Sequence, residues 1–116
     1  MFEIIYYHKD GQCPILDFLM KLPKKDRAKI LREVDLLQDF GLQLGMPHVK
    51  KMKGTDDLWE LRVKQGSDNY RIFYFTLKAK RFVLLHAFQK KSQKTPKKDI
   101  EIAEHRKTDF LERGEY

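Results

Sequence analysis

The sequence is poor in cysteine, glycine and proline. Its 116 residues include a single cysteine, Cys13, so no internal disulfide can form, and this favours a reducing, intracellular setting. The 6 glycines and 4 prolines argue against a collagen-like or disordered chain. The length fits one domain, residues 1–116.

Long apolar runs are also missing. Residues 82–85 form one of the longest uninterrupted apolar runs, far short of the about 18 residues that a membrane span requires. The N-terminus lacks the basic region and long apolar stretch of a secretory signal. We therefore expect a cytoplasmic protein without a membrane partner.

The motifs of common cofactor and metal enzymes are absent from the sequence. It has no glycine-rich phosphate loop, no Gly-x-Ser-x-Gly, and no cysteine or histidine set at metal-ligand spacing. We therefore expect neither a cofactor nor a metal site.

Positive charge is concentrated in the middle of the chain. The formal net charge is +7, and residues 47–98 contain 14 basic and 4 acidic side chains, whereas residues 1–46 contain 7 of each. This excess predicts a surface that binds nucleic acid, with an ordinary solvated surface as the alternative. Two lysine-rich stretches contribute to it: Lys50, Lys51 and Lys53 beside His48, and Lys90, Lys91 and Lys94.

The first part of the chain predicts one strand and two helices. Residues 2–7 are mostly β-branched or aromatic and precede a turn dipeptide, which is typical of a strand. Pro14 suits the first turn of a helix that Pro23 ends. The next helix has Gly41 as its C-terminal cap and apolar residues every three positions, namely Ala28, Leu31, Val34 and Leu37.

The rest of the chain predicts a meander and a last helix. Apolar and polar residues alternate over 58–64, so we expect Arg62 on the polar face of a half-buried strand. Strands over 70–77 and 82–88 follow, the second of them central in the sheet. Thr95 and Pro96 suit the N-cap and first position of a final helix. The predicted fold class is α+β: a strand, a helical hairpin, three or four antiparallel strands, and a C-terminal helix.

Several basic residues are suited to cleaving RNA without a metal. Such cleavage needs a base for the 2′-OH, cations for the charge on the phosphate, and an acid for the leaving oxygen. Arg62 and Arg71 suit the cationic role, because a guanidinium bonds two phosphate oxygens at once. Candidates for base or acid are a lysine of lowered pKa, His48 and His86. Because His86 interrupts an apolar strand, we prefer to interpret it as a hydrogen-bonded core residue.

Three blocks of the sequence together resemble a known family. They are Leu58-Trp59-Glu60-Leu61-Arg62, Tyr70-Arg71-Ile72-Phe73-Tyr74, and Val83 to Pro96 with its Phe88-Gln89-Lys90-Lys91. The chain resembles, over nearly its whole length, the HigB-like, phage-derived branch of the RelE/ParE toxin superfamily. This resemblance implies a type II toxin that cleaves messenger RNA on the ribosome and is silenced by a helix-turn-helix, HigA-like antitoxin.

The resemblance also implies roles for individual residues. Arg62 and Arg71 match strand arginines that stabilise the scissile phosphate, and Lys51 and Lys53 match lysines upstream of those strands. Lys90, Lys91 and Lys94 lie where other members place a catalytic tyrosine or histidine, although here no tyrosine follows Phe88 before Tyr116. We predict Arg62, Arg71, Lys90 and Lys91 as catalytic and Lys50, Lys51, Lys53, His48 and Lys94 as RNA-binding. Alternatives are a ParE-like inhibitor of DNA gyrase and a non-catalytic RNA-binding module.

Overall fold

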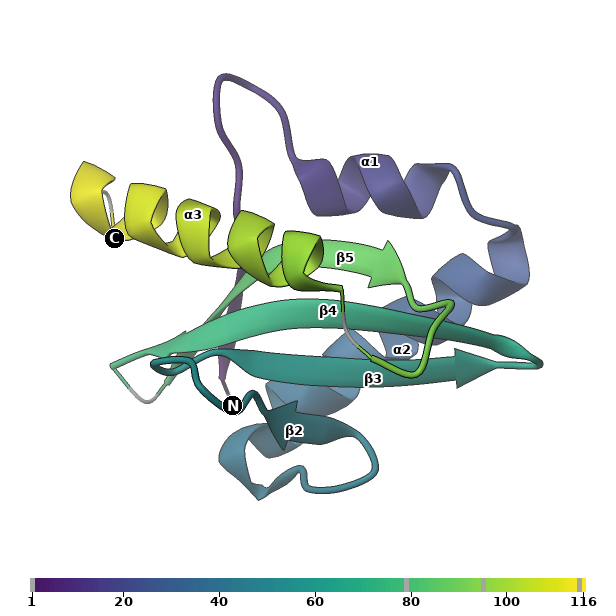
Figure 1. The fold of residues 1–116 in the computed structure, drawn as a ribbon. Helices are drawn as coiled ribbons and strands as arrows, with labels where there is room; N and C mark the ends of the chain where they lie inside the picture. Colours follow the sequence, from purple (N-terminus) through teal and green to yellow (C-terminus); the bar gives the residue numbers. More distant parts are fainter. Residues whose placement is uncertain (1, 79, 95, 115) are drawn as a thin grey trace.

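A five-stranded sheet separates two groups of helices (Figure 1). The computed structural model describes residues 2–78, 80–94, 96–114 and 116. In these residues, no helix is long and apolar enough to cross a membrane. The elements in chain order are β1 (Glu3–Tyr6), α1 (Pro14–Met20), α2 (Lys24–Phe40), a 3-10 turn (Gly41–Gln43), β2 (Val49–Lys51), β3 (Trp59–Gln65), β4 (Asp68–Leu77), β5 (Arg81–Gln89) and α3 (Lys97–Arg113).

The strand order is β1-β5-β4-β3-β2. Strands β2 to β5 form an antiparallel meander, and β1 pairs in parallel with β5. These pairings confirm the α+β class and the central position of the strand predicted over 82–88. The meander has four strands, because the short β2 adds to the three longer ones.

Helices α1 and α2 pack on one face of the sheet, and α3 packs on the other. The predicted second helix is present as α2, but Ala28 and Leu31, two of its four apolar residues at three-residue spacing, are exposed. Ile30, Val34 and Leu37 are buried instead. Three residues turn a helix by about 300°, so a strict three-residue repeat drifts around the helix and cannot stay on one face.

Helix α3 is held against the sheet by both apolar and polar contacts. Ala103 is fully buried, and the Phe110 ring meets Phe75 edge-on at 5.9 Å. Arg106 donates a hydrogen bond of 2.9 Å to the carbonyl of Leu85. Pro96 is the N-cap of this helix, one position later than predicted, and the predicted cap Thr95 lies outside the described residues.

A β-bulge in β5 changes which side chains face α3. Phe73 pairs with His86, but the next residue, Tyr74, pairs with Leu84, so Leu85 is an extra residue in β5. Before the bulge, Leu84 points into the core under α1 and α2, whereas after it Phe88 points into the core under α3. Such bulges re-aim the side chains that follow them. Because of the bulge, Phe88 points to the same face of the sheet as Arg71, its register partner on β4.

Gly41 ends α2 in a conformation that favours glycine. Its backbone has φ 54° and ψ −125°, a region almost restricted to glycine. A Cβ on Gly41 would lie 2.1 Å from Cε2 of the Phe2 ring. This close approach joins the end of α2 to the start of the sheet.

We therefore predict that Gly41→Ala lowers the free energy of unfolding by about 2 kcal/mol, because alanine is strained at this φ and ψ. Gly45→Ala is the matched control, since a Cβ there meets open space. Chemical denaturation of the two variants checks this. Equal midpoints would contradict the stated role of Gly41.

Candidate nucleic-acid interface and active site

Arg62 and Arg71 lie opposite each other on neighbouring strands. They are register partners in the β3–β4 pair, so their side chains share the α3 face of the sheet, as the alternation predicted for Arg62. The tight β3–β4 turn at Gly66 and Ser67 fixes this register. The main-chain N–H of Arg62 also donates, at 2.7 Å, to the carbonyl of His48, the residue immediately before β2.

A cavity of about 750 Å³ opens beside this pair. It lies where the β3–β4 turn meets the chain leaving β5. The structure therefore brings together all four residues predicted as catalytic. The lining residues are Arg62, Ser67, Asp68, Asn69, Arg71, Gln89, Lys90, Lys91, Ser92 and Gln93.

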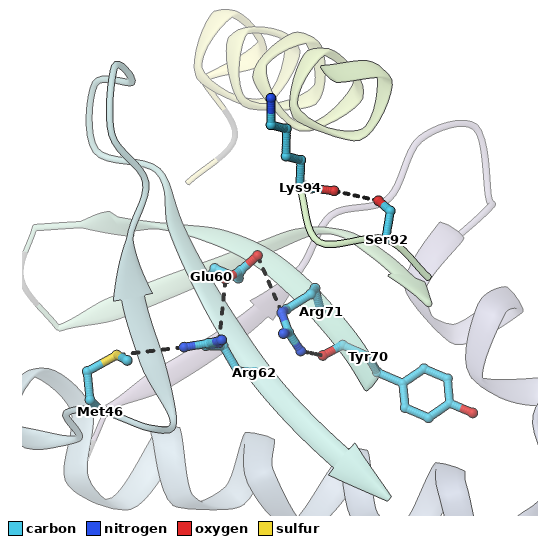
Figure 2. A network of polar contacts seen from close by, with 7 residues as sticks. All are labelled: Met46, Glu60, Arg62, Tyr70, Arg71, Ser92 and Lys94. Atoms are coloured by element: carbon cyan, nitrogen blue, oxygen red, sulfur yellow. Dashed lines mark hydrogen bonds and ion pairs between the residues drawn. The ribbon is translucent and has the colours of Figure 1, made fainter. Parts of the chain in front are cut away.

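Glu60 is the residue of this site that sequence reasoning missed. Figure 2 shows its carboxylate between the two guanidinium groups, with Oε1 3.8 Å from Nε of Arg62 and Oε2 3.6 Å from Nε of Arg71. Glu60 is 3% exposed, although the alternation placed it on a polar face. The register sets Glu60 beside the fully buried Phe73 of β4 and Lys50 of β2. The sequence feature that could have indicated this role is that Glu60 is the only acidic residue within 58–64, two positions before Arg62.

The Arg71 guanidinium is buried and incompletely satisfied. Its Nη1 donates to the carbonyl of Tyr70 at 3.0 Å, whereas its Nε and Oε2 of Glu60 make no hydrogen bond within the described residues. Burial lowers the pKa of Arg71, Arg62 lowers it further, and Glu60 opposes both effects. Arginine stays charged even so. An anion beside Arg62 and Arg71 would therefore be strongly stabilised, because one carboxylate offsets two cations.

Lys90 lines the same cavity as Arg62 and Arg71. Its main-chain N–H donates to the carbonyl of Asn69 at 2.7 Å, which ties it to β4. Burial lowers the pKa of Lys90, and the charges of Arg71, Arg62 and Lys50 lower it further, while Glu60 raises it. Lys90 is thus the lysine of lowered pKa that the charge pattern predicted.

The other predicted RNA-binding lysines lie outside the cavity lining. Lys50 pairs with Glu60 in register, so it shares the face of the arginines. Lys51 pairs with Trp59 and faces the opposite side, and Lys53 is exposed in the loop after β2. In Figure 2 the Lys94 side chain extends toward α3, away from Arg71. Their contact with RNA stays a prediction.

The two candidate histidines have different surroundings. His48 is half-buried in a second cavity, where its Nδ1 lies 3.0 Å from Oε2 of Glu33. His86 Nε2 lies 2.7 Å from Oδ1 of Asp99, and its Nδ1 lies 3.3 Å from Nη1 of Arg106. Burial lowers the pKa of His86. The interpretation of His86 as a hydrogen-bonded residue is therefore confirmed, although its side chain is part-buried and lies at the border of the core.

Comparison with known proteins agrees with this geometry. Residues 17–108, most of the chain, match the family model described as phage derived protein Gp49-like. The chain belongs to the Gp49-like family. This family is part of the RelE-like group of toxins from toxin-antitoxin systems. The comparison with curated proteins found no match.

Membership of the Gp49-like family confirms the predicted resemblance at the level of the RelE-like toxin group. Membership of the HigB-like branch stays a prediction. No three His, Cys, Asp or Glu residues of the described ranges are grouped so that they could hold a metal ion. The charged candidate residues that line the first cavity are Arg62, Arg71, Lys90 and Lys91, and Glu60 lies beside the two arginines.

We predict opposite shifts in the pKa of Lys90 when its charged neighbours are removed. Arg71→Ala should raise this pKa, because a cation that disfavours the ammonium form is lost, and Glu60→Gln should lower it, because a favourable anion is lost. NMR titration of the Lys90 ammonium group measures both shifts. Arg81→Ala, at the other end of β5, is the control that should leave it unchanged. Shifts of the same sign in Arg71→Ala and Glu60→Gln would contradict this electrostatic description.

Proposed function

We propose that this Gp49-like protein is the toxin of a type II toxin-antitoxin system and inhibits translation by cutting messenger RNA on the ribosome. One observation carries the proposal: two arginines from neighbouring strands and a lysine of lowered pKa line one cavity. This arrangement suits a phosphodiester whose charge increases during reaction. The family supports the class of toxin.

In this proposal, the scissile phosphate lies in the cavity against Arg62 and Arg71. The 2′-OH attacks phosphorus, the new P–O2′ bond forms, and the P–O5′ bond breaks. Negative charge grows on the non-bridging oxygens, where the guanidinium groups stabilise it. In this proposal the Glu60 carboxylate attracts both groups, offsets part of their mutual repulsion and keeps them oriented before RNA arrives. The cations that this mechanism needs are therefore side chains of the protein.

Lys90 is suited to act as the general acid. A lysine of lowered pKa gives up its proton more readily, and the departing O5′ needs one proton. The products are then a 2′,3′-cyclic phosphate and a 5′-hydroxyl end. The proton of the attacking 2′-OH must go to a base on the opposite side of phosphorus, because attacking and leaving oxygens lie roughly in line.

The proposed partners follow from the same class of activity. The ribosome and its messenger would be met in the cytoplasm, and Lys50, Lys51, Lys53 and Lys94 would contact RNA phosphates around the cavity. A co-encoded helix-turn-helix antitoxin of the HigA type would silence the toxin. An acidic segment of that antitoxin would complement the basic surface around the cavity.

We predict that Arg71→Ala and Arg62→Ala each abolish growth arrest on induced expression. Loss of one preorganised donor to a developing oxyanion costs about 10²- to 10³-fold in rate. Arg81→Ala, whose partner Glu3 lies at the far end of the sheet, should remain toxic. Arg71→Ala also removes the buried partner of the buried Glu60, so this variant could lose toxicity by unfolding. The side chain of Arg62 is more exposed, so Arg62→Ala is the variant that tests the role in cleavage with less effect on the fold.

Full toxicity of both variants would show that the arginines are wrongly assigned. Arrest with DNA damage and intact messages would instead indicate a gyrase inhibitor. Absence of arrest in the parent protein would favour a non-catalytic RNA-binding module. Counting colonies and measuring the DNA-damage response of the same cultures separates these outcomes.

A further inference from the structure

A second cavity, of about 310 Å³, lies beside the first and shares Arg62, Arg71 and Asn69 with it. It lies between α2 and the part of β3 that extends beyond the pairing with β2. Lys29 and Lys64 add positive charge to its lining, and Pro47 and Val63 add apolar surface. A nucleotide whose phosphate contacts the two arginines would therefore extend into this space.

His48 and Glu33 form a hydrogen-bonded pair in the second cavity. Glu33 is buried on α2, and its Oε2 lies 3.0 Å from Nδ1 of His48. Since an ionised carboxylate only accepts hydrogen bonds, Nδ1 carries the hydrogen, and Nε2 of the neutral ring keeps a free lone pair. The carbonyl of His48 also accepts from the N–H of Arg62, which fixes the histidine relative to that arginine.

Lys90 lies only in the first cavity and His48 only in the second, whereas Arg62 and Arg71 line both. In-line displacement at phosphorus places the attacking and leaving oxygens on opposite sides of the phosphate. A phosphate held by the shared arginines would therefore have Lys90 on one side and His48 on the other. His86 is a poorer candidate, since Asp99 and Arg106 occupy its two ring nitrogens.

We propose that His48 is the general base of the cleavage reaction and that Glu33 is the residue that positions it. This proposal rests on the proposed function, RNA cleavage at the shared arginines. Nε2 of His48 takes the proton of the 2′-OH as O2′ bonds to phosphorus. The P–O5′ bond breaks, and O5′ takes its proton from Lys90. Glu33 holds the ring tautomer and orientation without touching the reacting atoms.

Charged groups from α2 and from the sheet line the cavity around His48, and they contribute to the pH dependence of the cleavage rate. From α2 these are Glu33 and Lys29, which lie 3.7 Å apart, and from the sheet they are Arg62, Lys64 and Arg71. Glu33 is the only acidic residue among the described residues that line this cavity. The pH profile of the cleavage rate is therefore a readout that a merely structural role of His48 would leave unchanged.

The test uses ribosomes carrying a defined message, with initial cleavage rates measured across pH. His48→Gln should lower kcat by about 10²- to 10⁴-fold and change the pH profile of the rate. Glu33→Gln should lower kcat by about tenfold with KM unchanged, since the ring is less well oriented, and Glu33→Asp should restore part of the loss. Matched controls are His105→Gln and Glu101→Gln, two exposed residues of α3 that should behave like the parent.

The outcomes separate this proposal from the proposed function. If Arg71→Ala is inactive while His48→Gln keeps the parent rate and pH profile, RNA cleavage stands and the base is wrongly assigned. If Glu33→Gln changes KM alone, Glu33 does not position the base. If the parent protein cuts no message on the ribosome, both proposals are overturned.

Discussion

The buried carboxylate of Glu60 between Arg62 and Arg71 is the interaction on which the site depends. Two guanidinium groups side by side on neighbouring strands repel each other, and Arg71 is also removed from water. Glu60, at 3.6 to 3.8 Å from both, offsets part of this repulsion without satisfying either group by a hydrogen bond. The folded sheet therefore keeps a net positive charge beside the first cavity, and this charge would attract an anionic substrate.

Two features of the fold place further groups around that charge. The bulge at Leu85 turns the end of β5 toward the arginines, so that Lys90 lines their cavity. Helix α2 brings Glu33 and His48 to the other side, next to the open edge of β3. The family assignment places the chain in the RelE-like toxin group, and the division of acid and base between two cavities is our proposal from this geometry.

Local sequence pattern was sufficient for β1, β3, β4 and β5 and for the shared face of the arginines, because alternation shows which side chains point together. It did not locate the short β2. It was insufficient for Glu60, since burial of a polar-face residue depends on which side chains surround it across the sheet. The bulge at Leu85 likewise depends on how β4 and β5 pair. Ala28 is exposed because a strict three-residue repeat drifts around the helix. The Glu33–His48 contact joins a helix to a later turn, which no local pattern indicates.

The most direct test of the central claim is to map messenger 5′ ends in cells after induction of the protein or of Arg71→Ala. The account predicts new ends clustered within translated frames for the parent protein and none for Arg71→Ala. Messages that remain intact during growth arrest, or the same new ends in Arg71→Ala, would contradict it.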